Sequence, residues 1–231
     1  MKYVLAINFK TYRTSYGSSA VRIAREADEV AKDYPGLVEV ILLPPVTEIL
    51  RIANSVTYSR VFAQHVDPVE EGAYTGHVTP EMVREAGAAG VMLNHSERRL
   101  RLDEINLILG RARRLGLRTL VCADTPEVAA AASILRPEML AVEPPELIGT
   151  GIPVSKAKPE IVRNTVDKVR RLNEEVVILT GAGITAGDDA AAAVRLGTQG
   201  VLLASAVMKA ENPGRVVREM AEAMVRTSGT G

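Results

Sequence analysis

Short apolar runs alternate with amphipathic segments along the whole chain. The runs are rich in Val, Ile and Leu and do not alternate with polar residues, which is typical of strands buried on both faces of a parallel sheet. The predicted strands are residues 3–8, 38–43, 60–64, 90–94, 118–123, 140–143, 176–180 and 200–203.

The segments between these runs have helical character, and several carry start or stop signals. The predicted helices are residues 18–32, 46–54, 80–86, 102–115, 126–134, 158–171, 186–196 and 213–226. Thr79, Thr125 and Asn212 each precede a proline, which places a capping side chain before a proline at the first helical position. Gly116 and Gly197 are placed to end helices before a strand.

Strict alternation of strands and helices predicts an α/β fold, a (β/α)8 barrel. A doubly wound open sheet is the alternative, but the residues after the first run, Asn8-Phe9-Lys10-Thr11, are not a glycine-rich dinucleotide fingerprint. No linker or low-complexity tract interrupts the pattern. We therefore expect one domain that spans residues 1–231.

The amino-acid composition excludes several classes of partner and favours one cellular compartment. Hydrophobic residues make up 47% of the chain, enough for a large core, and 28 Lys and Arg balance 28 Asp and Glu. A balanced charge argues against a nucleic-acid partner. A single cysteine excludes an internal disulfide and fits a reducing compartment. No apolar stretch approaches the length of a membrane span, and the first run is too short for a signal peptide, so we expect a cytoplasmic protein without a membrane partner.

In a (β/α)8 barrel the chemistry lies at the carboxyl ends of the strands. Asn8 and Lys10 end the first predicted strand with one residue between them, so their side chains should point the same way. His95 lies at the fourth tip, where Ser96 and Glu97 begin a helical turn that would favour a neutral imidazole. Glu143 ends the otherwise apolar sixth run. Taken singly, each residue could have an ordinary structural role.

The seventh and eighth tips carry small residues. Gly181-Ala182-Gly183 follows the seventh strand, and Ala204-Ser205 follows the eighth. Small side chains let backbone N–H groups approach a phosphate, and these two loops are the usual phosphate site of such barrels. Cys122 has no basic neighbour in the sequence and is interpreted as a packed thiol. His65 and His77 flank an acidic loop without a recognisable metal-ligand spacing, so we expect no metal site.

Taken together, these motifs resemble the triosephosphate isomerase family. The resemblance rests on Asn8-x-Lys10, on residues 95–99 (HSERR), on Glu143-Pro144 and on residues 148–151 (IGTG), and it runs through all the predicted strands. It implies a cofactor-free interconversion of dihydroxyacetone phosphate and D-glyceraldehyde 3-phosphate. The acid–base logic of that enzyme is a known example of pKa tuning.

The resemblance also implies a role for each matching residue. Glu143 matches the base, and His95 matches the neutral electrophile. Lys10 matches the cation that stabilises the enediolate, Asn8 helps to place the substrate oxygens, and Glu97 matches the carboxylate that holds the lysine. The matching lid and phosphate-binding positions are Ile148, Gly149, Gly183, Ala204 and Ser205.

The chain departs from the commoner bacterial and eukaryotic pattern. It is shorter, it has Pro145 where the lid usually carries an aromatic residue, and it has Gly183 where a serine is usual. Such compact chains resemble the archaeal branch of the family, which implies a homo-oligomer, a tetramer, in which Thr75 reaches a neighbouring subunit's site. Two other functions stay open at this point: another sugar-phosphate enzyme on the same kind of barrel, and a non-catalytic binding barrel.

Overall fold

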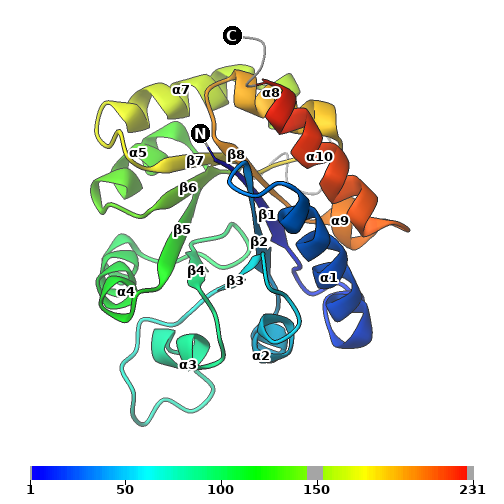
Figure 1. Cartoon of the computed structure of the whole chain (residues 1–231). Coiled ribbons are helices and arrows are strands. Elements are labelled where there is room, and N and C mark those ends of the chain that lie inside the picture. Colours follow the sequence, from blue (N-terminus) through cyan, green and yellow to red (C-terminus); the bar gives the residue numbers. More distant parts are fainter. Residues whose placement is uncertain (1, 145–152, 228–231) are drawn as a thin grey trace.

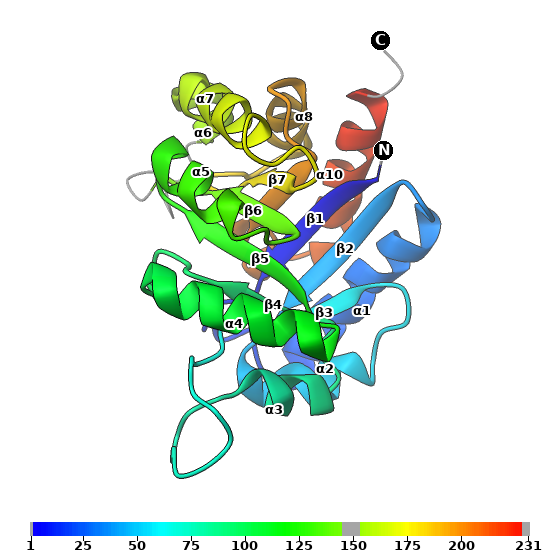
Figure 2. The same cartoon turned by 90° about the vertical axis from the view of Figure 1, so that its left-hand side faces the viewer.

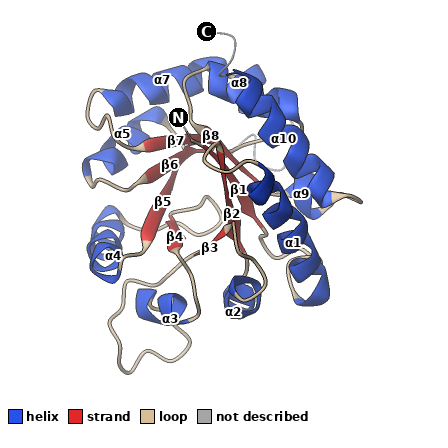
Figure 3. Ribbon diagram, in the orientation of Figure 1, coloured by secondary structure: helices blue, strands red, loops and turns tan. Residues whose placement is uncertain are grey.

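Eight parallel strands form a closed barrel in the order β1 to β8 (Figures 1 and 3). The structure is a computed structural model and describes residues 2–144 and 153–227. The strands are β1 (Tyr3–Asn8), β2 (Val38–Leu43), β3 (Arg60–Ala63), β4 (Gly90–Leu93), β5 (Arg118–Ala123), β6 (Met139–Val142), β7 (Val177–Thr180) and β8 (Gly200–Leu203). The predicted (β/α)8 barrel is confirmed, and the open doubly wound sheet is excluded because β1 pairs with both β2 and β8.

Helices surround the strands on the outside of the barrel (Figure 3). They are α1 (Gly17–Asp33), the 3-10 turn η1 (Val46–Glu48), α2 (Ile49–Ala53), α3 (Pro80–Glu85), α4 (Leu102–Leu115), α5 (Pro126–Ile134), α6 (Val154–Ala157), α7 (Pro159–Arg170), α8 (Gly187–Arg195), α9 (Ser205–Met208) and α10 (Pro213–Thr227). Among the described residues, no helix is long and apolar enough to cross a membrane.

The predicted N-terminal helix caps are confirmed by hydrogen bonds. The Thr79 and Thr125 hydroxyls accept from Met82 N and Val128 N, and Asn212 Oδ1 accepts from Arg215 N. These bonds satisfy N–H groups that a helix's first turn leaves without an internal partner. Gly116 ends α4 with a left-handed φ of 70°, a conformation that glycine adopts without steric penalty.

The core has two layers, because each strand is buried on both faces. Alternate residues of β1 point inward and outward: Val4 and Ala6 belong to the cluster inside the barrel, and Leu5 and Ile7 to the larger cluster under the helices. The inner cluster consists of Val4, Ala6, Ile41, Leu43, Phe62, Met92, Leu120, Cys122, Met139, Ala141, Leu179 and Leu202. The barrel is therefore a packed core rather than a pore.

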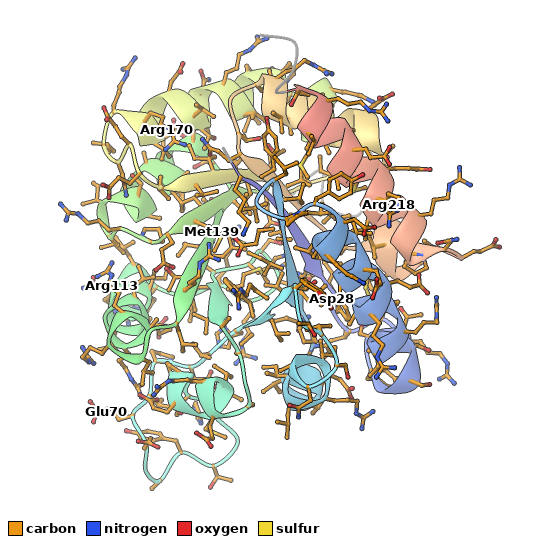
Figure 4. All side chains as sticks on the ribbon, viewed as in Figure 1. Asp28, Glu70, Arg113, Met139, Arg170 and Arg218 are labelled. Carbon is orange, nitrogen blue, oxygen red and sulfur yellow. The ribbon has the colours of Figure 1, made fainter. Side chains whose placement is uncertain are left out.

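Most charged residues lie on the outside, and the buried exceptions among the described residues are Asp28, Glu48, Asp67, Arg111, Glu143 and Asp189. Figure 4 shows Arg113, Arg170 and Arg218 on the outer helices, whereas Met139 lies among the strands. The long connection between β3 and α3, which carries Glu70, extends away from the body of the barrel (Figure 2). Polar groups that are buried at the strand ends are therefore exceptions that call for an explanation.

Candidate active site

The tip of β1 brings Asn8 and Lys10 together through the backbone. Asn8 is buried, and its Oδ1 accepts from Lys10 N at 3.0 Å and from Gln64 Nε2 at 3.1 Å. Gln64 Nε2 also lies 3.2 Å from the Lys10 carbonyl. Lys10 has a φ of 49°, which is uncommon for a residue with a side chain. Because Asn8 Oδ1 is engaged, the side-chain NH2 is the group that Asn8 can offer to a ligand oxygen.

Lys10 is held by Glu97, from the connection after β4. Lys10 Nζ lies 2.7 Å from Glu97 Oε1, and the two side chains are 15% and 57% exposed. A charge-assisted hydrogen bond of this length restricts the ammonium to one place in the pocket. The sequence prediction that Glu97 holds the lysine agrees with this contact, although its part in catalysis stays a prediction.

His95 is buried, and its tautomer follows from one contact. The Glu97 N–H donates to His95 Nδ1 at 3.1 Å, so Nδ1 is an acceptor and the neutral ring carries its proton on Nε2. Burial, and then the Lys10 cation, lower the pKa of His95 from 6.5 to about 4. A neutral imidazole was predicted from a helical turn at Ser96 and Glu97. The structure has a single turn here, in which Arg98 N donates to the His95 carbonyl, and α4 begins at Leu102, as predicted. Burial, rather than the dipole of a helix, is the main cause of the lowered pKa of His95.

Glu143 follows β6 and is buried, with an exposed fraction of 5%. Burial raises the pKa of this carboxyl from 4.5 to about 7, and the Cys122 thiol and Lys10 moderate the rise. Its Oε2 is fully covered and is without a hydrogen-bond partner in the described parts of the chain. Its Oε1 lies 3.6 Å from His95 Nε2. A carboxyl poised near neutral pH beside a neutral imidazole is suited to accept a proton.

The neighbouring strands make the room for this carboxyl. Gly181, just after β7, lies so close that a Cβ there would be 2.9 Å from Glu143 Cγ and 3.1 Å from Oε1. Cys122 on β5 is a packed thiol, as predicted, and it packs against Glu143, which together with burial raises the thiol's pKa. The prediction from the sequence places Gly181 in a phosphate-binding loop and places no site residue beside Cys122.

One pocket at the carboxyl ends of the strands brings most of the predicted residues together. The predicted residues that line it are Asn8, Lys10, His95, Glu143, Gly183, Ala204 and Ser205. Ser205 begins α9, where backbone N–H groups lack partners within the helix, and Gly183 has a φ of 66°. The pocket is also lined by Tyr12, which the sequence analysis missed. Ile148 and Gly149 lie outside the described residues.

The acidic loop after β3 has a structural role in this structure. His65 Nε2 lies 3.2 Å from Asp67 Oδ1, and Arg98 Nη2 lies 3.1 Å from the same oxygen. Asp67 Oδ2 accepts from Val78 N across the base of the loop at 2.7 Å. Within residues 2–144 and 153–227, no three His, Cys, Asp or Glu side chains are grouped as a metal ion would require.

Comparison with known proteins decides the family. The sequence model of the family described as "Triosephosphate isomerase" matches residues 3–224. The chain belongs to the triosephosphate isomerase family. It is therefore an isomerase that interconverts two triose phosphates, dihydroxyacetone phosphate and D-glyceraldehyde 3-phosphate.

The similar curated proteins cover almost the whole chain. The chain is 46% identical over 223 residues to the triosephosphate isomerase of Saccharolobus solfataricus, which covers 96% of each chain. It is 46% identical over 223 residues to that of Metallosphaera sedula, with the same coverage. It is 48% identical over 214 residues to that of Methanoculleus marisnigri, covering 93% of this chain and 95% of the relative. The resemblance seen in the short motifs thus extends through the barrel.

Proposed function

We propose that this triosephosphate isomerase carries out its reaction with Glu143 as the base and His95 as the electrophile. The observation that carries the proposal is the pairing of the two groups: a buried carboxyl with a pKa of about 7 and a neutral imidazole whose Nε2 lies 3.6 Å from it. Proton removal from a carbon beside a carbonyl needs a base at that carbon and a donor at the oxygen.

The proton balance follows from this arrangement. Glu143 takes a proton from the carbon next to the carbonyl of dihydroxyacetone phosphate, and the electron pair of that C–H bond forms the carbon–carbon double bond of the enediolate. His95 Nε2–H hydrogen-bonds to the oxygens and moves protons between them. Glu143 returns its proton to the neighbouring carbon, which gives D-glyceraldehyde 3-phosphate. No oxidant, metal or cofactor takes part in this sequence.

Fixed charge and dipoles stabilise the intermediate in this proposal. Lys10 Nζ, held by Glu97 at 2.7 Å, supplies a positive charge where the enediolate oxygen develops. The Asn8 NH2 group faces the substrate oxygens, because Asn8 Oδ1 is already bonded to Lys10 N and Gln64. The backbone N–H groups of Gly183, Ala204 and Ser205 hold the phosphate, with Ile148 and Gly149 completing the site.

The experiment compares the wild-type protein with Glu143→Gln and with Glu85→Gln. Turnover of D-glyceraldehyde 3-phosphate is followed by coupling dihydroxyacetone phosphate to its dehydrogenase. Glu143→Gln should lower kcat by about 10²–10⁴-fold, the range for loss of a general base. Glu85→Gln is the control, since Glu85 is an exposed carboxylate at the end of α3 and should leave kcat unchanged. Near-normal turnover of Glu143→Gln would remove Glu143 from its role. An inactive wild-type protein would point to a different sugar phosphate.

We propose further that the chain is one domain over residues 1–231 and works as a homotetramer in the cytoplasm. Exposed apolar side chains support two contact surfaces. One surface lies around η1, α2 and α3, where Val46, Leu50 and Met82 are about half exposed, and the other lies on α4 and α5 with Leu102, Leu107, Val128 and Ile134. Exposed apolar side chains that gather on one face mark interaction sites, so burial of these residues between subunits would support the tetramer. Light scattering measures the mass, and a monomer in dilute solution would refute the tetramer.

A further inference from the structure

Asn94 has an unusual backbone conformation next to His95. It directly follows β4, and its φ of 60° lies in the left-handed region. Asparagine adopts this conformation more readily than other residues with a Cβ. The side chain is buried, with 6% exposed, so its polar atoms need partners inside the protein. A left-handed residue here ends the extended course of β4 directly before His95.

The Asn94 side chain connects two different parts of the barrel. Its Nδ2 donates to the Cys122 carbonyl on β5 at 2.9 Å. Its Oδ1 accepts from the backbone N–H of Leu100 at 3.0 Å. Arg99 Nη1 lies 3.4 Å from the Asn94 carbonyl. The Asn94 side chain thus holds the two ends of the segment 94–100 together, and it also fixes this segment to β5.

The groups fixed in this way belong to the proposed catalytic machinery. His95 and Glu97 lie within the closed segment, where Glu97 N donates to His95 Nδ1 at 3.1 Å and Glu97 Oε1 holds Lys10 at 2.7 Å. Cys122, whose carbonyl receives the Asn94 bond, is also the residue whose thiol packs against Glu143. A movement of Asn94 would therefore shift the His95 imidazole and, through Glu97, the Lys10 ammonium. It would also shift Cys122, which packs against the Glu143 carboxyl.

We propose that Asn94 is a positioning residue for the isomerisation: its left-handed backbone and its two side-chain hydrogen bonds fix the tautomer and the direction of His95. The inference rests on the roles proposed for His95 and Glu143. Asn94 does not line the pocket that contains Asn8, His95 and Glu143, so it would act through the imidazole. A displacement of about 1 Å in a catalytic group can lower the rate about 100-fold, so the effect should be measurable.

Two substitutions separate the two features. Asn94→Ala removes the side-chain bonds and disfavours the left-handed backbone, whereas Asn94→Gly removes the bonds but retains the backbone freedom. We expect kcat to fall at least about 10-fold in Asn94→Ala and to recover in part in Asn94→Gly. KM should change less than kcat, because the phosphate-binding loops after β7 and β8 are not attached to this residue.

A second readout is independent of turnover. The chain has three histidines, so the ring nitrogens of His95 can be assigned by NMR with His65→Gln and His77→Gln variants. In the wild type, Nδ1 should appear as an unprotonated acceptor and Nε2 as protonated. Asn94→Ala should give a mixture of tautomers. A wild-type kcat and a wild-type tautomer in Asn94→Ala would overturn the proposal. This measurement needs no substrate, so it distinguishes failure of this inference from failure of the proposed catalytic roles.

Gly116 provides a matched control. It has a φ of 70°, close to that of Asn94, but it lies between α4 and β5, at the opposite ends of the strands, and a Cβ there would meet no atom within 4 Å. Gly116→Ala introduces a comparable left-handed backbone penalty far from the pocket, and should lower the melting temperature without changing kcat or the His95 tautomer. If Gly116→Ala lowered kcat as much as Asn94→Ala does, the effect would reflect stability alone, and the proposal would be wrong. If Asn94→Ala does not fold, Asn94→Gly with a wild-type His95 signal and kcat gives the same refutation.

Discussion

The raised pKa of Glu143 predicts that this residue makes the folded protein less stable as the pH rises. Its carboxyl has a pKa of 4.5 as a free group and about 7 in the fold, because burial disfavours the charged form. The folded state therefore holds a proton that the unfolded state releases. The stabilisation is complete below pH 4.5 and is lost as the pH rises through 7. The full change is about 3.5 kcal/mol, because the pKa rises by about 2.5 and each pKa unit corresponds to about 1.4 kcal/mol.

Glu143→Gln isolates this effect, because the amide has nearly the same shape and does not titrate. Between pH 5 and pH 8 the wild type should lose about 2.5 kcal/mol of unfolding free energy relative to the variant. For a domain of this size that is roughly 5–10 °C in melting temperature. The measurement is the thermal unfolding of both proteins, followed by circular dichroism, at several pH values between 4.5 and 8.5.

His95 titrates in an overlapping range with the opposite sign. Its pKa is lowered from 6.5 to about 4, so the stability that it contributes is lost as the pH falls from 6.5 through 4. Both proteins contain His95, and the difference between them cancels its contribution. The substrate phosphate, which has a pKa near 6, is also absent from this measurement, unlike in a pH–rate profile. A stability difference that stays constant between pH 5 and pH 8 would refute the reasoning that burial sets the pKa of Glu143.

Two further predictions concern the surroundings of the base. Lys10→Met retains the length of the side chain but removes the positive charge that Glu97 holds at 2.7 Å. We expect kcat to fall at least about 10²-fold while the melting temperature changes little. A change in melting temperature with an unchanged kcat would show that the ion pair has a structural role only. Gly181→Ala puts a Cβ 2.9 Å from Glu143 Cγ and should lower kcat at least about 10-fold with a smaller change in KM; unchanged kinetics would show that the carboxyl does not depend on this glycine.

The strands could be predicted from the sequence because burial on both faces gives them an almost purely apolar composition. The bounds of β1, β2, β5 and β8 match the prediction residue for residue. Three predicted strands, at residues 60–64, 90–94 and 140–143, included a polar last residue that lies just outside the ladder, namely Gln64, Asn94 and Glu143. The side chains of these three residues make hydrogen bonds or close contacts around the site, just past the last regular strand residue. The four-residue helices α6 and α9 were missed, since four residues show no helical period.

The sequence predicts which residues lie at the site, but not the contacts between them. Asn8, Lys10, His95 and Glu143 stand at strand tips, and the barrel brings strand tips together. The contacts of Gln64 with Asn8, of Gly181 with Glu143 and of Asn94 with Cys122 join residues from different strands. Such contacts depend on the register between strands and on side-chain direction, and neither leaves a periodic signal in one sequence.

The barrel wall contributes to the burial that raises the pKa of Glu143. Glu143 N donates to the Ala123 carbonyl at 2.7 Å, and Gly181 N donates to the Val142 carbonyl at 2.9 Å, so the sheet continues for one step on both sides of Glu143. This ladder fixes the backbone of Glu143, and small neighbours on β5 and after β7 pack around its buried carboxyl. Substitutions in this wall should therefore shift the pH profile, whereas substitutions in the loops after β7 and β8 should change substrate affinity. The same burial that suits Glu143 to the proposed role of base makes the folded protein less stable when this carboxyl is charged.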